Sequence, residues 1–410
     1  SASPKVGRGS SWLRRGPKRF LASLPEGPLT QPSSEPQAKY EVLAADRWQV
    51  LMNHEIEMLG ALEQMPVPLQ EVLDHATTPR ELAEFCSAEL PKFFARRVVL
   101  IENLVGWLRI PELVNASDTL REWHGKFALC PLEPNLEEFT SFAREILAAG
   151  SAMSHDMAVG IRRLQSVAQN DTDFDKWLDE WFRARISTTV LLKQYIAIAP
   201  EEDGGDGKPT GFVDLQCDVL ATVNEAIAAV SKLCQEYTGK CPEVIVDGLE
   251  ECKFSYVPSI LYDVMTELLK NSMHATVKVK PADKLTQYPI RITICEDSER
   301  VILRVADEAE GIRGVTPTTA QEVVPGTTAE DIEDKSEIWS YMCGSPARSG
   351  ASVDEDAAAT PLSGYGMGLP FARLQVRYLG GDLKLMTFPG FGTDARVVMP
   401  RLGLHTTTLA

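Results

Sequence analysis

The segment of residues 256–276 constrains this chain most, because its side chains sort onto two faces of a single helix. It reads YVPSILYDVMTELLKNSMHAT, and Pro258 suits a first helical position, where the missing N–H costs nothing. Apolar residues recur at helical spacing along one face: Leu261, Val264, Leu268 and Ala275. A second face carries four polar side chains: Glu267, Lys270, Asn271 and His274. The segment therefore predicts a helix with one face in the core and one polar face.

The polar face has the composition of a site for magnesium and nucleotide phosphates. The side-chain oxygen of Asn271 is a hard ligand of the kind that Mg²⁺ prefers. Lys270 and His274 can face the negative charge of phosphate groups. Taken alone, the row is equally consistent with the solvated face of an ordinary amphipathic helix.

Three later stretches favour the nucleotide interpretation. Residues 301–311, VILRVADEAEG, predict a buried strand that ends in Asp307, with Gly311 four residues on. Residues 364–369, GYGMGL, form a glycine-rich loop that runs into an apolar helix, and residues 390–393, GFGT, precede a closing strand. A lone glycine motif is a weak signal, but these pieces in this order after the first helix indicate an ATP site.

Together these pieces resemble the ATP-binding domain shared by gyrase, the heat-shock chaperone ATPases and sensor histidine kinases. Within that group the chain is similar to the mitochondrial 2-oxoacid dehydrogenase kinases, first to the pyruvate dehydrogenase kinases and second to the branched-chain kinases. The likeness covers about residues 40–402 and rests on these stretches: ELLKNSMHAT, IWSYMCGSPA, PLSGYGMGLPFARL, GGDLKL, GFGTDA and, upstream, WFRARIS. The implied fold is α+β, with an N-terminal four-helix bundle followed by an α/β-sandwich ATP-binding domain of the gyrase and histidine-kinase type.

The resemblance implies a role for individual residues of this chain. Glu267 would be the general base that orients and deprotonates a protein serine, and Asn271 would be the Mg²⁺ ligand. Asp307 would accept a hydrogen bond from the adenine amino group, supported by Thr393. The full set implied to contact ATP is Glu267, Lys270, Asn271, His274, Asp307, Gly311, Gly344, Ser345, Gly364, Tyr365, Gly366, Met367, Gly368, Leu369 and Thr393.

The resemblance also implies partners, and the chain departs from the family in ways that leave alternatives open. The implied substrate is the E1 α subunit of pyruvate dehydrogenase in the mitochondrial matrix, with the lipoyl domain of E2 as docking partner and a homodimer as the functional state. However, His274 stands where the family usually has Arg, Ala309 replaces the first glycine of its DxGxG motif, and its Asp-Trp tail is absent. A branched-chain kinase and a catalytically weak scaffold on the complex are therefore the alternatives.

Two further interpretations concern His155. The triplet 154–156, Ser-His-Asp, superficially resembles the phospho-accepting box of two-component kinases, but the following residues do not fit that box. Related kinases bind a carboxylate effector among their helices, and His155 and Arg185 match that site. Ala152 and Thr189 replace its two other arginines, so the resemblance implies an effector site that is only partly preserved.

Composition bounds the remaining possibilities and the division into domains. A net charge of −17 over 410 residues argues against nucleic acid as a partner, and no apolar run approaches the ~18 residues of a membrane-spanning helix, so no membrane insertion is expected. We predict a basic, transit-like disordered segment over 1–39, a helical domain over 40–200, a linker over 201–211, an ATP-binding domain over 212–403 with a lid over 312–363, and a tail over 404–410.

Overall fold

The computed structural model describes residues 45–62, 67–129, 135–167, 173–199, 212–249, 251–312, 339–341 and 367–401. The predicted transit-like segment, the linker, the tail and most of the lid lie outside these described residues.

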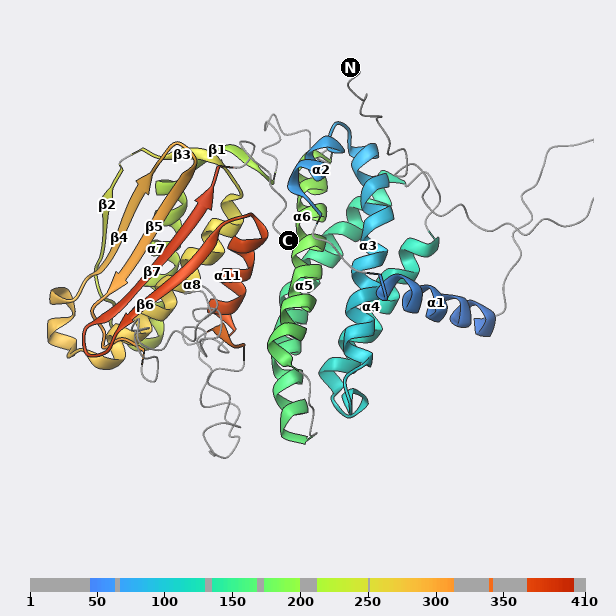
Figure 1. Ribbon diagram of the computed structural model, residues 1–410, viewed down its shortest axis with the longest axis horizontal. Coiled ribbons are helices and arrows are strands. Elements are labelled where there is room, and N and C mark those ends of the chain that lie inside the picture. The colour runs from blue at the N-terminus through green and yellow to red at the C-terminus, as the bar shows by residue number, and fades with distance from the viewer. Residues whose placement is uncertain are drawn as a thin grey trace, which may run out of the picture. The chain divides into compact units, whose positions relative to one another are not determined.

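The N-terminal part of the described chain is helical. Its elements are α1 (Ala45–Gly60), α2 (Leu69–Asp74), α3 (Pro79–Glu102), the 3-10 helix η1 (Trp107–Arg109), α4 (Pro111–Leu129), α5 (Leu136–Val167) and α6 (Phe174–Ile198). Helices α3, α4, α5 and α6 pack against one another. Figure 1 shows the long helices α3, α5 and α6.

Local sequence signals explain where the two central helices begin. Helix α3 starts at a Pro in the first turn, and the preceding Thr78 accepts a hydrogen bond from the N–H of Glu81. Asp173 caps α6 in the same way by accepting from the N–H of Lys176. Both helices then bury large side chains such as Phe94 and Trp181, each stabilising the fold by about 1.5–3 kcal/mol relative to exposure.

The second part of the described chain is built on a mixed five-stranded sheet in the order β2-β4-β5-β7-β6. Its strands are β2 (Val244–Gly248), β4 (Ile290–Glu296), β5 (Arg300–Asp307), β6 (Asp382–Phe388) and β7 (Gly392–Pro400), and only β2 and β4 pair in parallel. Two further strands, β1 (Asp214–Asp218) and β3 (Lys253–Tyr256), pair separately, and the 3-10 helix η2 (Ala282–Gln287) precedes β4.

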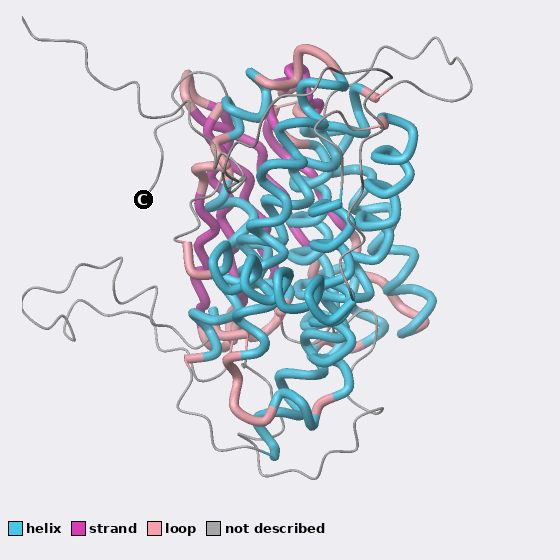
Figure 2. The backbone as a smooth tube through the Cα atoms, turned by 90° about the vertical axis from the view of Figure 1, so that its right-hand side faces the viewer, coloured by secondary structure: helices cyan, strands magenta, loops and turns pink. Residues whose placement is uncertain are grey.

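Three helices cover one face of the large sheet: α7 (Val219–Thr238), α8 (Pro258–Val279) and α11 (Gly368–Tyr378). The layers are visible in Figure 1 and, from the helical side, in Figure 2. The alternation of apolar residues explains this packing, because every second residue of β4 and β5 is buried beneath the helices: Ile290, Ile292, Ile294, Val301, Leu303 and Val305. The predicted α+β class is confirmed.

None of the helices in the described residues is both long enough and apolar enough to span a bilayer.

Candidate active site

Helix α8 forms the floor of the candidate site and has the two faces that its sequence predicts, except that Ala275, predicted for the apolar face, is only partly buried. It begins at Pro258, buries Leu261, Val264 and Leu268, and leaves the polar row on another face. In that row Glu267, Lys270 and His274 are half-buried and Asn271 is exposed. The four side chains are therefore accessible to a ligand while their helix is anchored in the core.

The Glu267 carboxylate lies between a cation and the start of a second helix. Lys270 Nζ is 2.8 Å from Glu267 Oε1, and the two side chains are only 15% and 29% exposed. Gly368, the first residue of α11, lies against the other carboxylate oxygen, so that a Cβ at this position would collide with Glu267 Oε2. The absence of a side chain at Gly368 thus lets the carboxylate reach the N-terminus of α11, whose free N–H groups favour anions.

Asn271 presents its amide oxygen to a ligand. Its Nδ2 donates to the backbone carbonyl of Glu267 at 2.7 Å, so the oxygen is the atom left for coordination. Among the described residues no group of three or more His, Cys, Asp or Glu side chains could hold a metal. A single amide oxygen fits Mg²⁺ that is carried mainly by nucleotide phosphates and water, which is how this ion is usually bound.

His274 continues the row but carries little positive charge near neutral pH. Burial lowers the pKa of its imidazole, and the nearby ammonium of Lys278 lowers it further. The departure from the family's Arg at this position therefore replaces a permanent cation with a group that is mostly neutral.

Asp307, the residue that the resemblance implies for the adenine amino group, is the last residue of β5. Its Oδ1 accepts from the N–H of Ala309 at 3.1 Å, and its Oδ2 accepts from the hydroxyl of Ser272 at 3.0 Å. It pairs in register with Thr393 on β7, whose N–H also bonds to it. Burial nevertheless raises the pKa of the Asp307 carboxyl, because loss of solvent outweighs these donors.

Close backbone approaches shape the loop around Asp307. Gly311 has a φ of 73°, and a Cβ there would lie 2.7 Å from the carbonyl oxygen of Phe388. Gly392 packs on the carbonyl of Asp307 so closely that any side chain would clash. Ala309, which stands at the first glycine of the family's DxGxG motif, is buried and supplies an N–H to the carboxylate.

The structure describes only some of the residues that the resemblance implies for ATP. The loop residues Gly344, Ser345, Gly364, Tyr365 and Gly366 lie outside the described residues, as do most of the lid and the side chain of His155. Met367 and Leu369 flank Gly368 at the start of α11 and are half-buried.

Sequence reasoning missed Ser272. Its partner is 35 residues away on another element, so no local spacing could reveal the contact.

Residues 339–341, which fall within the predicted lid range of 312–363, are hydrogen-bonded to α6. Asp175 Oδ1 accepts from the Ser340 hydroxyl at 3.0 Å and from the N–H of Tyr341 at 2.9 Å. The phenol of Tyr341 donates to Asp179 at 2.7 Å, and its ring is 2% exposed. These residues from within the predicted lid are therefore hydrogen-bonded to the helical part of the chain.

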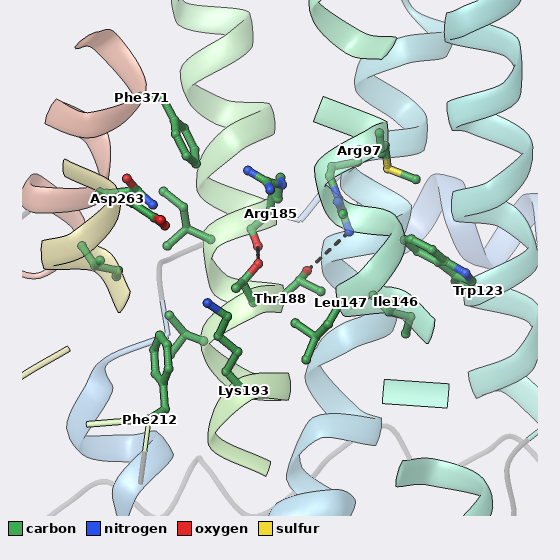
Figure 3. Close-up of a pocket in the computed structure, with 17 residues that line it drawn as sticks. Arg97, Trp123, Ile146, Leu147, Arg185, Thr188, Lys193, Phe212, Asp263 and Phe371 are labelled. Carbon is green, nitrogen blue, oxygen red and sulfur yellow. Dashed lines mark hydrogen bonds between the residues drawn. The ribbon is translucent and has the colours of Figure 1, made fainter. Parts of the chain in front are cut away.

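A separate cavity of about 190 Å³ contains Arg185 from α6, Arg97 from α3 and Phe371 from α11 among its lining residues (Figure 3). Burial lowers the pKa of Arg97 to about 9, with a contribution from the charge of Arg185, and burial lowers that of Arg185 to about 10. Among the described residues neither arginine forms a salt bridge, and Arg185 Nε has no hydrogen-bond partner. The cavity thus holds two buried guanidinium groups, and the carboxylate of Asp263, which also lines it, is the nearby negative charge that favours the charged form of Arg185.

Comparison with known proteins accounts for both parts of the chain. Residues 66–214 match the family described as "Mitochondrial branched-chain alpha-ketoacid dehydrogenase kinase", and residues 256–403 match "Histidine kinase-, DNA gyrase B-, and HSP90-like ATPase".

Three curated relatives are named pyruvate dehydrogenase kinases. The chain is 27% identical over 365 residues to the mitochondrial [pyruvate dehydrogenase (acetyl-transferring)] kinase of Arabidopsis thaliana, covering 85% of this chain and 94% of the relative. It is 25% identical over 376 residues to isozyme 4 of Homo sapiens, covering 86% and 85%. A Schizosaccharomyces pombe kinase is 30% identical over 240 residues, covering 57% and 52%. The chain belongs to the mitochondrial 2-oxoacid dehydrogenase kinase family and has that family's ATP-binding domain.

Proposed function

We propose that this chain is an ATP-dependent protein serine kinase that phosphorylates the E1 α subunit of pyruvate dehydrogenase in the mitochondrial matrix. The observation that carries the proposal is the Glu267 carboxylate, held between Lys270 and the N-terminus of α11, one helical turn before Asn271. Phosphoryl transfer depends mainly on positioning and charge neutralisation, and this arrangement offers both. Docking on the E2 lipoyl domain and a homodimeric state are parts of the same proposal.

Each residue has one task in the proposed reaction. Glu267 orients the substrate serine and takes its proton as the oxygen attacks the γ-phosphate. Lys270 and the N–H groups of α11 receive phosphate charge, and Asp307 accepts from the adenine amino group. Asn271 would hold Mg²⁺, which when bound neutralises charge on the phosphates.

The decisive experiment incubates the chain with Mg²⁺-ATP and separately purified E1 proteins of the pyruvate and branched-chain complexes. We expect phosphate on the α chain of pyruvate E1. This phosphate should be stable in acid and removed by alkali, as phosphoserine is. Label on branched-chain E1 alone would assign the chain to that complex instead. Acid-labile label on the chain itself, lost in His155→Ala, would favour the two-component interpretation, and ATP binding without transfer would favour a scaffold.

His274 should make ATP binding depend on pH. Phosphates near the imidazole favour its charged form, so the pKa of His274 is higher in the complex than in the free protein, and binding takes up a proton. ATP affinity should therefore rise as pH falls from about 8 to about 6. His274→Arg should remove the part of this pH dependence that comes from His274, and it should raise ATP affinity at pH 8 by about threefold.

The control for this prediction is His274→Gln, which should remove the same part of the pH dependence without raising ATP affinity. Because ATP itself titrates in this range, the comparison is between variants measured in the same buffers by calorimetry. Equal pH slopes in the wild type and in His274→Gln would show that His274 lies away from the phosphates.

We also propose that the cavity beside α6 binds a small carboxylate that regulates the kinase. The unpartnered Nε of Arg185 supports this, since a buried guanidinium with an unsatisfied donor favours an anion, and the charge of Asp263 on the same cavity offsets the burial of Arg185 only in part. Pyruvate added to the E1 assay should change the rate in the wild type, and Arg185→Gln should abolish the response. The control is Arg183→Gln, an exposed arginine on the same helix, which should respond normally.

A further inference from the structure

Ser272 makes an unusual contact for a serine inside a helix. Such hydroxyls commonly bond back to the carbonyl four residues earlier, and Ser187 and Thr188 on α6 do so at 3.1 and 2.9 Å. Ser272 is 8% exposed, and its hydroxyl donates instead to Oδ2 of Asp307 at 3.0 Å. The contact joins α8 to the end of β5, two elements that meet only through tertiary packing.

The two oxygens of Asp307 are held from different directions. Oδ1 is bound by the N–H of Ala309, which belongs to the same loop as the carboxylate. Ser272 binds Oδ2 from α8, the helix that also carries Glu267 and Asn271. The N–H of Thr393 on β7 also bonds to the carboxylate, but the Ser272 hydroxyl is the donor that ties it to the helix at the phosphate end of the site.

The same hydroxyl opposes protonation of the carboxylate. Burial of Asp307 and the nearby Asp394 on β7 both disfavour its charge, while the Ser272 hydroxyl and the N–H groups of Ala309 and Thr393 favour it. Asp394 is itself paired with Arg304 of β5 at 2.8 Å. A protonated Asp307 would hold a proton where the amino group of adenine must donate one.

We propose that Ser272 is a positioning residue that sets the preference for adenine by fixing Asp307 as an oriented acceptor. This inference rests on the proposed function, in which Asp307 accepts from the adenine amino group. Ser272 touches neither the phosphates nor the serine substrate in this scheme. It acts through the carboxylate alone, so its removal should affect recognition of the base rather than of the triphosphate.

The test compares ATP with purine riboside triphosphate, which lacks only the amino group at C6. We expect Ser272→Ala to weaken Mg²⁺-ATP binding by about tenfold, the usual effect of losing one hydrogen bond to a charged group, and binding of the purine analogue by less than about twofold. Thermal unfolding of the free variants checks that the domain remains folded. Ser272→Thr, which keeps the hydroxyl, should retain most of the selectivity.

The matched control is Thr276→Val, one turn further along α8. Thr276 is fully buried and its hydroxyl has no hydrogen-bond partner among the described residues, so this change removes a buried hydroxyl without touching Asp307. Its selectivity should equal that of the wild type.

The outcomes separate the two proposals. If the wild type bound both nucleotides equally, the assignment of Asp307 to the adenine amino group would fail. If the wild type preferred ATP and Ser272→Ala kept the same ratio, only the role of Ser272 would fail. If Ser272→Ala bound both nucleotides more weakly by the same factor, Ser272 would only support the fold and would have no role in selecting adenine.

Discussion

Glu267→Gln is expected to lower phosphoryl transfer to E1 by at least about a hundredfold while changing ATP affinity by less than about threefold. Gln keeps the length of the side chain and can still accept a hydrogen bond from Lys270, now 2.8 Å from Oε1. It has no basic oxygen to take the serine proton. The loss should therefore appear in kcat, measured with saturating ATP, and not in the dissociation constant of ATP.

The control is Glu225→Gln on α7, where the side chain is exposed and outside the polar row. It removes the same charge and should leave transfer unchanged. Near-normal transfer by Glu267→Gln would show that Glu267 is not the general base.

Gly368→Ala should lower transfer by roughly a hundredfold although the protein stays folded, since small misplacements of reacting groups have effects of this size. Gly368 is not among the described glycines with positive φ, so its backbone can accept alanine. The new Cβ would instead lie 2.9 Å from Cδ of Glu267 and closer still to Oε2. The carboxylate, at the end of a flexible side chain, must move away from the α11 N-terminus.

Gly125→Ala in α4 is the matched control, because a Cβ there meets no atom within 4 Å. A glycine inside a helix costs about 0.5–1 kcal/mol relative to alanine, so this variant should be slightly more stable and fully active. Steady-state kinetics and thermal unfolding of both variants separate displacement of Glu267 from general destabilisation. Normal kcat in Gly368→Ala would mean that the position of the Glu267 carboxylate is not critical.

The sequence predicted those parts of the molecule whose signals are local. The helix of α8, with its buried and polar faces, follows from periodicity and from Pro258 at its start. The strand ending at Asp307 follows from an apolar run closed by an acid, and α11 follows from an apolar segment after glycines. These elements carry the candidate site, so its main residues could be named before the fold was known.

Contacts between distant elements could not be predicted in this way. The approach of Gly368 to Glu267 joins residues about a hundred positions apart, and only the packing of α11 on α8 creates it. The burial of Arg97 could not be predicted either, because a basic residue in a helix is ordinarily placed at the surface. Here Arg97 is 2% exposed, and its guanidinium stacks on the rings of Phe94 and Trp181. Tertiary packing overrode the local preference.

The bonds from residues 339–341 to α6 bear on how this protein could be recombined. The ATP-binding part contributes Ser340 and Tyr341, but the acceptors Asp175 and Asp179 belong to the helical part. A chimera that joins residues 212–401 to a foreign helical domain would leave the buried phenol and the buried N–H of Tyr341 without hydrogen-bond acceptors. The two parts could be exchanged between proteins only if the helical part kept these two aspartates. In this respect the two parts are inherited as one unit and not as two separable modules.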